Sequence, residues 1–392
     1  MVIFLKKFLF SLILICVFLI SFTNKKEVKA KNLPLILELK SAKSAILMEV
    51  ETGNILYQFN AEEKRSPASM TKIMTMKLVL DKIRNKQLNM DDLLTTSDYA
   101  ASMGGSQIFL APNEQMKVED LFKSMVIASA NDAAVVLAET VSGSENNFVN
   151  KMNHTARLIG CKNTNFSNAT GLPTLNHYTT CYDMALISCN LLKDYEDIVI
   201  KYSSMYESYI RTDTPNPFWL VNTNKMLKGN SLIDGLKTGW TEEAGYCITT
   251  TMKKDGMRLV CVVMGAATPT LRNSDAMTLL NYGFNEYELV TLKEKNEIVN
   301  TESDVLVQPS NYNIVTSDKM CFLKSCNQSY NNVTYDVTLY RDKIRRQEAV
   351  NIGIIKAYVD GKLVDEVSLN LEEKLKKSSF IEILAKVFSS LF

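Results

Sequence analysis

Alternating apolar and polar positions mark the first predicted strands of the chain. Between residues 45 and 57 the alternation surrounds the turn-forming stretch Glu51-Thr52-Gly53-Asn54, which predicts an antiparallel hairpin. Two more strands are predicted at residues 246–252 and 257–264, joined across Lys254-Asp255-Gly256, where the glycine can take a positive φ. The strand signals therefore come in two groups, far apart along the chain.

Between these groups the apolar positions recur at helical spacing. From about residue 69 to residue 191 the periodic stretches include Met70, Ile73, Met74 and Leu78, and later Val118, Leu121, Phe122 and Met125. Sheet, helices and sheet again predict one α+β domain over residues 31–288, in which the terminal strands share an antiparallel sheet.

After about residue 290 the pattern changes to short β-rich runs separated by polar turns. Examples are residues 304–307, 333–339 and 354–359. This pattern predicts a smaller all-β domain over residues 289–370, with a boundary near residues 287–290.

The last segment, residues 371–392, is predicted to be an amphipathic helix. Four lysines lie off a single apolar stripe, which consists of Phe380, Ile381, Leu384, Val387, Phe388 and Leu391. No later element can cover this stripe, which favours a helix lying on a membrane surface. Packing of the helix on its own domain is the alternative.

Residues 1–30 are predicted to form a secretory signal peptide. Lys6 and Lys7 precede an apolar run at residues 8–22, and a polar stretch then ends in Val28-Lys29-Ala30. The run of about 15 residues is short for a membrane span. We therefore expect export with cleavage after Ala30, and an uncleaved anchor is the alternative.

Composition adds few constraints on function. The 44 Lys plus Arg and 43 Asp plus Glu leave a formal charge of +1, so nothing points to nucleic acid. Loss of Cys16 with the signal leaves seven of the eight cysteines, an odd number that excludes a complete disulfide framework, although Cys321 and Cys326 could pair. The chain has no C-x-x-C spacing and two histidines, so neither a metal nor a cofactor is expected.

A serine and a lysine lie three residues apart in Ser69-Met70-Thr71-Lys72, just after Pro67 and at the start of a helical stretch. Positions three apart share a helix face, so the Lys72 amine can reach the Ser69 hydroxyl. Serine is a poor nucleophile until a neighbour takes its proton, and a desolvated lysine can stay neutral for that purpose. The spacing occurs once in the chain.

Two further motifs follow. Ser129-Ala130-Asn131 lies on a predicted turn between two helices, where its hydroxyl and amide could face a cleft. Lys237-Thr238-Gly239-Trp240 precedes the strand at residues 246–252, and Lys-Thr-Gly occurs once. Lysine and a hydroxyl on an edge strand can bind a carboxylate, while glycine lets a substrate backbone approach closely.

In this order and separation, the three motifs resemble those of the penicillin-recognising serine enzymes. The closer resemblance is to the D-alanyl-D-alanine carboxypeptidases, the low-molecular-mass penicillin-binding proteins of the type-five kind, and it covers nearly the whole mature chain. It implies a β-lactamase/transpeptidase-like α+β fold followed by a small all-β domain and an amphipathic helix. Supporting segments are Gly104-Gly105-Ser106, residues 168–172, His177 with Asp183, residues 222–224 and residues 234–236.

The resemblance also implies catalytic roles. Ser69 would attack the carbonyl between two D-alanines while Lys72 accepts its proton. Ser129 would then relay a proton to the leaving amine, and Asn131 would position Lys72 and the peptide. His177 and Asp183 could suggest a Ser-His-Asp triad, but a structural histidine is expected because Ser69 already has a lysine partner.

Substrate binding is implied in the same way. Lys237 and Thr238 would hold the terminal carboxylate, with Arg272 as a second anchor. The backbone N–H groups of Ser69 and Trp240 would form the oxyanion hole. Trp240 replaces the residue types seen elsewhere in the family after Gly239, and it could narrow substrate choice.

The expected function is removal of D-alanine from peptidoglycan stem peptides at the outer face of the cytoplasmic membrane or in the cell wall, with β-lactams as covalent inhibitors. A β-lactamase is the nearest alternative. Class A enzymes carry a deacylating glutamate between the second and third motifs, and no Glu occurs here from residue 146 to residue 195. A catalytically idle wall-binding protein is the other alternative, and the retention of every reactive residue argues against it.

Overall fold

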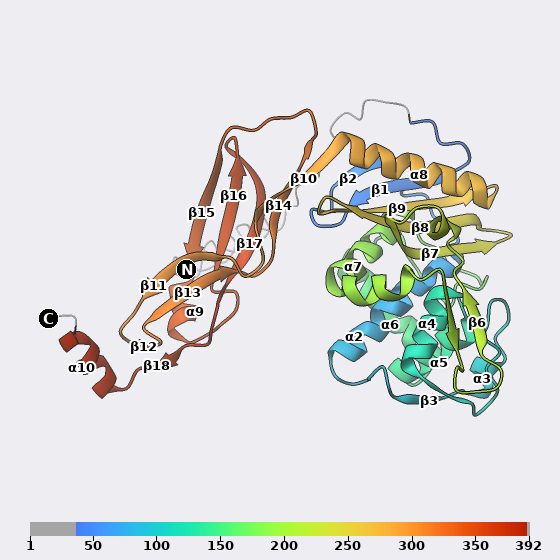
Figure 1. Cartoon of the computed structure of the whole chain (residues 1–392), viewed down its shortest axis with the longest axis horizontal. Helices are drawn as coiled ribbons and strands as arrows, with labels where there is room; N and C mark the ends of the chain where they lie inside the picture. The colour runs from blue at the N-terminus through green and yellow to red at the C-terminus, as the bar shows by residue number, and fades with distance from the viewer. Residues whose placement is uncertain (1–36, 390–392) are drawn as a thin grey trace, which may run out of the picture. The chain divides into compact units, whose positions relative to one another are not determined.

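The computed structural model describes residues 37–389, so the predicted signal segment at residues 1–30 lies outside the described residues. The first part of the chain (Figure 1) contains β1 Ser44–Glu49, β2 Ile55–Phe59, the 3-10 turn η1 Ala68–Thr71, α2 Lys72–Arg84, β3 Leu93–Thr95, α3 Asp98–Ala101, β4 Gln115–Lys117, α4 Val118–Ile127, α5 Asn131–Ser142, α6 Glu145–Ile159, α7 Cys181–Ser203, β5 Glu207–Ile210, β6 Phe218–Val221, the 3-10 turn η2 Lys225–Lys228, β7 Ile233–Thr241, β8 Gly245–Lys254, β9 Met257–Ala266 and α8 Pro269–Glu286.

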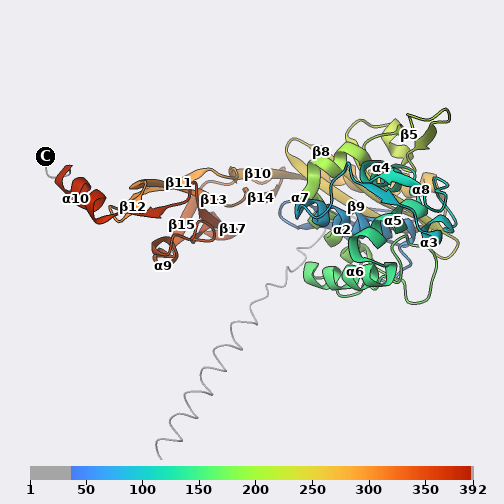
Figure 2. The same ribbon diagram turned by 90° about the horizontal axis from the view of Figure 1, so that it is seen from below.

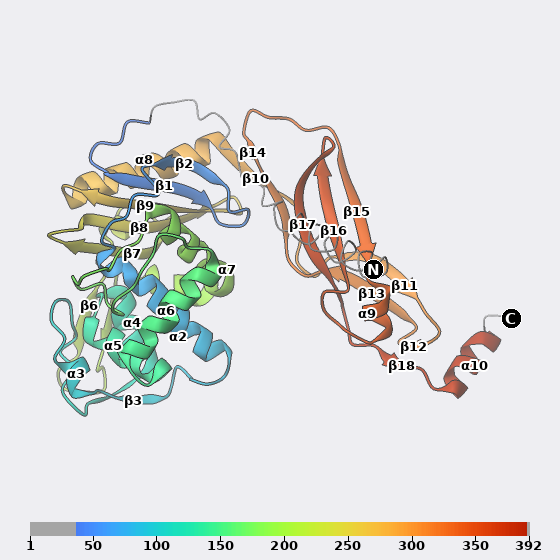
Figure 3. The ribbon, with the colours of Figure 1, turned by 180° about the vertical axis from the view of Figure 1, so that it is seen from behind.

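A five-stranded antiparallel sheet organises this part, in the order β2-β1-β9-β8-β7. Helix α8 covers one face and the helices α2 to α7 lie on the other, as Figure 1 shows and Figure 3 repeats from behind. Both predicted hairpins are confirmed, and the β8–β9 turn has positive φ at Asp255 (50°) and Gly256 (80°). The α+β class is confirmed, and β7 is an edge strand of the sheet.

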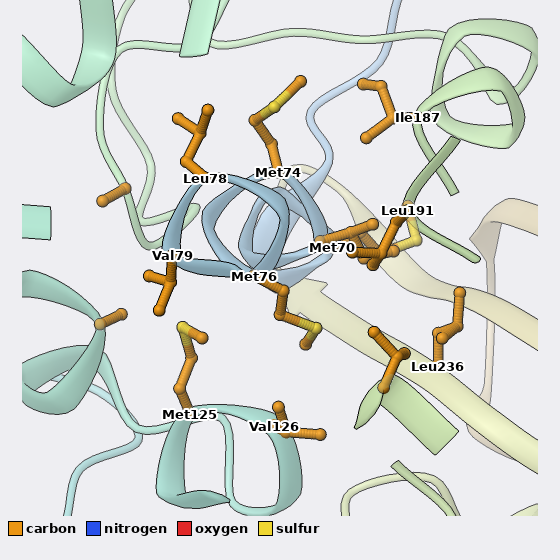
Figure 4. Packing of buried hydrophobic residues seen from close by; sticks show 14 of the residues in the cluster. Met70, Met74, Met76, Leu78, Val79, Met125, Val126, Ile187, Leu191 and Leu236 are labelled. Atoms are coloured by element: carbon orange, nitrogen blue, oxygen red, sulfur yellow. The ribbon is translucent and has the colours of Figure 1, made fainter. Parts of the chain in front are cut away.

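Helix α2 is the centre of the helical block. Nine consecutive residues, from Lys72 to Leu80, are buried, which is the signature of a helix enclosed on all sides. Figure 4 shows its methionines and aliphatic side chains surrounded by Val126 from α4, Leu191 from α7 and Leu236 from β7. This enclosure holds the first turn of α2 rigidly behind the edge strand.

The second part of the chain is rich in strands. It contains β10 Tyr287–Lys293, β11 Ile298–Ser303, β12 Val307–Gln308, β13 Asn311–Thr316, β14 Met320–Ser325, β15 Val333–Leu339, α9 Arg341–Arg345, β16 Gly353–Val359, β17 Lys362–Leu371, β18 Lys376–Lys377 and α10 Phe380–Ser389. Five strands form a sheet in the order β11-β13-β17-β16-β15, and β10 pairs with β14 (Figure 2). A core of its own includes Ile314, Met320, Ile355 and Leu369.

The prediction of a helix from residue 371 onward is wrong for its first nine residues. Leu371 ends β17, β18 follows, and the helix begins at Phe380. Leu371 and Leu375 are buried in the apolar core of the second part of the chain, so their side chains pack in that core and do not belong to the apolar stripe of a helix. Within residues 37–389, no helix has the length and apolar character needed to span a bilayer.

The possible pairing of Cys321 with Cys326 is also wrong. All seven cysteines within the described range are free thiols, and six of them are buried while Cys326 is exposed. Cys321 lies inside β14 among apolar neighbours, where it acts as a small hydrophobic side chain.

Candidate active site

The first turn of α2 brings Ser69 and Lys72 together. Ser69 lies in η1 and Lys72 begins α2, with 3.1 Å between Ser69 Oγ and Lys72 Nζ. Pro67 precedes the turn and lacks an N–H, which suits a helix start. The serine is partly exposed while the lysine is fully buried. The hydroxyl therefore faces solvent, with its amine partner behind it.

Lys72 is held by two acceptors besides the serine. Its Nζ donates to Asn131 Oδ1 at 2.7 Å and to the Thr170 carbonyl at 2.7 Å. Burial, and then the positive charge of Lys237, lower the pKa of Lys72 well below its usual value. Both acceptors are uncharged, so no carboxylate contacts the amine to keep it protonated. The arrangement favours a neutral amine that can take the Ser69 proton.

The second motif lies where α4 ends and α5 begins. Ser129 has a left-handed backbone, with φ of 64°, and its buried Oγ has no hydrogen-bond partner among the described residues. Asn131 donates from Nδ2 to the Gly104 carbonyl at 2.7 Å and from its backbone N–H to the Ser106 carbonyl at 2.7 Å. A strained residue with an unused hydroxyl is typical of a functional site.

The third motif lies on β7, directly against the serine turn. A Cβ added to Gly239 would lie 2.9 Å from Pro67 O and 3.0 Å from Ser69 N, so only glycine allows this approach. Lys237 is buried, and burial, followed by the positive charge of Arg272, lowers its pKa to about 7. Thr238 Oγ1 donates to Thr223 Oγ1 at 2.7 Å.

A cleft of about 480 Å³ opens above these residues. The first turn of α8 closes one end and supplies Arg272, whose pKa is lowered to about 10 by burial. Trp240 is 57% exposed and lies beside Tyr246, with ring centroids 5.9 Å apart. A helix N-terminus, an arginine and a lysine around one cleft make a site suited to an anionic group.

The structure gathers all nine candidate residues in and behind this cleft. Its lining includes Ser69, Ser129, Thr238, Gly239, Trp240 and Arg272. Lys72, Asn131 and Lys237 are buried behind that lining. The motifs did not identify Thr170, whose carbonyl contacts Lys72, or the cleft residues Ser106, Thr223 and Lys225. The segments at residues 104–106, 168–172 and 222–224 contain three of these four, and they had supported only the family resemblance.

His177 has a structural position, as the sequence suggested. Its Nε2 is 2.8 Å from Thr71 Oγ1, and its Nδ1 accepts the Ser167 N–H at 3.0 Å. Burial lowers its pKa to about 4. Asp183 instead accepts hydrogen bonds from the backbone of residues 162–163 and from Thr164. No contact that would form a triad joins these two residues.

The loop at residues 166–172 holds Lys72 but contains no carboxylate of its own. Glu145, at the start of α6, reaches the loop, and its Oε1 accepts the Ala169 N–H at 2.8 Å. Its Oε2 accepts the Tyr99 hydroxyl at 2.6 Å. Both oxygens of this glutamate are therefore engaged, one with the loop and the other with Tyr99.

A partly exposed serine with a buried lysine, placed between a helical block and the edge of an antiparallel sheet, defines a serine acyl-transfer enzyme of the penicillin-recognising class. The D-alanyl-D-alanine carboxypeptidase family model matches residues 28–268. The chain belongs to this family of serine peptidases.

Known proteins match most of the chain. D-alanyl-D-alanine carboxypeptidase DacF of Bacillus subtilis is 40% identical over 382 residues, 97% of each sequence. Penicillin binding protein 5 of Haemophilus influenzae has a similar structure, with a TM-score of 0.69 at 27% identity over 87% of this chain and 99% of that one. Penicillin-Binding Protein D2 of Listeria monocytogenes, solved with ampicillin bound, is 32% identical with a TM-score of 0.56, over 65% of this chain and all of the other.

Proposed function

We propose that this chain is a serine-type D-alanyl-D-alanine carboxypeptidase that removes the terminal D-alanine from peptidoglycan pentapeptides through an acyl-enzyme on Ser69. The observation that carries the proposal is the 3.1 Å contact between Ser69 Oγ and the buried Lys72 amine. A neutral amine at this distance can accept the hydroxyl proton as the oxygen attacks the carbonyl carbon.

The remaining groups fit the later steps of acylation. The Ser69 and Trp240 backbone N–H groups would stabilise the charge on the carbonyl oxygen. The unpartnered Ser129 hydroxyl is suited to pass a proton to the leaving D-alanine amine, which breaks the peptide bond. Lys237, Thr238 and Arg272 would hold the D-alanine carboxylate. Water then hydrolyses the ester and restores Ser69.

Penicillin should form the same ester and remain attached. The opened lactam keeps its leaving amine tethered in the cleft, whereas D-alanine departs and lets water in. Glu145, which reaches the loop at residues 166–172, already accepts two hydrogen bonds. This geometry gives no support to fast β-lactam turnover.

Mass spectrometry can test the proposal directly. The wild type should remove one D-alanine from a disaccharide-free pentapeptide and, after mixing with excess penicillin, should carry an adduct on Ser69 for minutes or longer. Ser69→Ala should abolish both reactions, while Ser204→Ala, at an exposed serine directly after α7, should change neither. Labelling of the Ser69→Ala variant, or an adduct lost within seconds as the antibiotic is consumed, would overturn the assignment.

We place the enzyme at the outer face of the cytoplasmic membrane, held there by α10. Five apolar side chains of this helix are between 42% and 78% exposed: Phe380, Ile381, Leu384, Val387 and Phe388. Such a stripe supports binding in the plane of a membrane surface. The Lys386 amine donates a hydrogen bond to the Val307 carbonyl at 2.7 Å, which connects α10 to strand β12.

A further inference from the structure

A second depression lies beside the catalytic cleft, and we call it the Lys64 depression. It has a volume of about 570 Å³, and its wall includes Lys64, Arg65, Leu175, Tyr178 and Glu243. Ser66 also lines it, whereas Ser69, three residues later, lines the catalytic cleft. The two hollows therefore flank the serine turn, and nothing in the proposed chemistry uses the second one.

Strand β7 connects the two hollows. Thr238 and Trp240 line the catalytic cleft, and Glu243 lies in the turn that follows the strand. Glu243 follows Trp240 by three residues and lies in the turn beyond Thr241, so it is found past the end of the cleft wall that β7 forms. If the substrate carboxylate lies at Lys237 and Thr238 and the scissile carbonyl at Ser69, the acyl part must leave along β7 toward Glu243. An extended peptide of three residues reaches roughly 10 Å in this direction.

The charges around the depression are mostly positive. Lys64 is exposed, and its amine lies 4.5 Å from the centre of the Tyr178 ring. Arg65 is paired with Glu63 at 2.6 Å through Nη2, but its buried Nε has no hydrogen-bond partner among the described residues. His177 also lines the wall, with both ring nitrogens already engaged. Glu243 is the one acidic residue of the lining.

We propose that the Lys64 depression binds a carboxylate carried by the third residue on the acyl side of the stem peptide, next to Lys64 and Arg65. This assignment rests on the proposed carboxypeptidase function, since that function fixes the direction of the peptide. Leu175, which is 88% exposed at the rim, offers apolar surface to the aliphatic part of the same residue. The two hollows together then select a peptide by its terminal carboxylate and by a second carboxylate on its acyl side.

Two synthetic peptides test the proposal. Both end in D-alanyl-D-alanine and differ only in a carboxylate or a carboxamide on the third residue of the acyl side. Exposed charge pairs contribute about 0.2 to 1 kcal/mol, so the wild type should cleave the carboxylate peptide with a kcat/KM about 1.4 to 5 times higher. Lys64→Gln should remove this preference, and Glu243→Gln, which removes the opposing charge, should increase it.

Two controls separate the subsite from the active site. Lys254→Gln, at an exposed lysine at the far end of β8, should keep the wild-type preference. The rate of penicillin acylation should be unchanged in all three variants, since that ligand has no peptide arm to reach the depression. Cleavage without discrimination by the wild type, or a preference that survives Lys64→Gln, would refute the subsite alone. Failure of the wild type to cleave either peptide would refute the carboxypeptidase function, and the subsite with it.

Discussion

The charge of Lys237 should set an upper pH limit on peptide cleavage. Burial, with the positive charge of Arg272, lowers the pKa of this lysine to about 7, so the ammonium predominates below that pH and is lost above it. The proposed partner of this ammonium is the D-alanine carboxylate. Lys72 titrates with the opposite consequence, because its neutral form is the active one and its pKa is also lowered. Activity should therefore rise and then fall as the pH increases.

The expected size of the fall follows from the titration. With a pKa of about 7, Lys237 is about 90% charged at pH 6 and about 10% charged at pH 8, and each further pH unit removes about another factor of ten. Once Lys72 is fully neutral it cannot offset this loss. Because kcat/KM reports the free enzyme, its alkaline limb should lie near pH 7. The limb of kcat should lie higher, since a bound carboxylate stabilises the ammonium.

The assay is the initial rate of D-alanine release from pH 5 to pH 10, for the wild type and for Lys237→Arg. A guanidinium at this position stays charged, so the variant should lose the alkaline limb up to about pH 10, near the lowered pKa of Arg272. The comparison concerns the shape of the profile, because the larger side chain should reduce the rate itself. Lys254→Arg is the matched control. A wild-type kcat/KM that stays constant from pH 7 to pH 9, or an alkaline limb unmoved in the variant, would refute the role of the Lys237 charge.

Two further changes probe the strand and the C-terminal helix. Gly239→Ala places a Cβ 2.9 Å from Pro67 O, so β7 must move away from the serine turn. Because small displacements of reacting groups slow a reaction strongly, penicillin acylation measured by stopped flow should be about 10- to 100-fold slower. An unchanged acylation rate would contradict this reasoning, because it would show that β7 accommodates the added Cβ without displacing the reacting groups. A chain ending at Ser379 should leave the membrane fraction on sedimentation and keep its acylation rate. A chain ending before Leu371 should, in addition, unfold at a lower temperature, because it loses Leu371 and Leu375 from the core of the second part of the chain. Continued sedimentation of the chain ending at Ser379 would place the anchor elsewhere.

Local patterns of apolar residues predicted the sheet and the central helix because each pattern lies within one element. The apolar residues of the β1–β2 hairpin, and those that begin at Met70, are properties of short segments, although β1 and the first nine residues of α2 are buried throughout. The serine–lysine contact was predictable for the same reason, since both residues lie on one turn.

The contacts that complete the site come from distant loops and leave no periodic signal. The Thr170 carbonyl contacts Lys72 across 98 positions of the sequence. Every residue has a backbone carbonyl, so the residue type at this position does not reveal the contact. The start of α10 was misplaced because Leu371 and Leu375 continue the apolar character of the helix backward, although they belong to a strand and its neighbouring core. Sequence pattern alone does not tell which core an apolar residue joins.

The distribution of thiols gives the protein a ready attachment point for a reporter group. Burial raises the pKa of Cys181, Cys189 and Cys321 to about 12, and these side chains have almost no surface. Maleimides and similar reagents attack the exposed thiolate, so they should spare these three. Cys326, which directly follows β14, is the exposed thiol among the described residues. A fluorophore or spin label can therefore be placed in the strand-rich part of the native chain without replacing any residue.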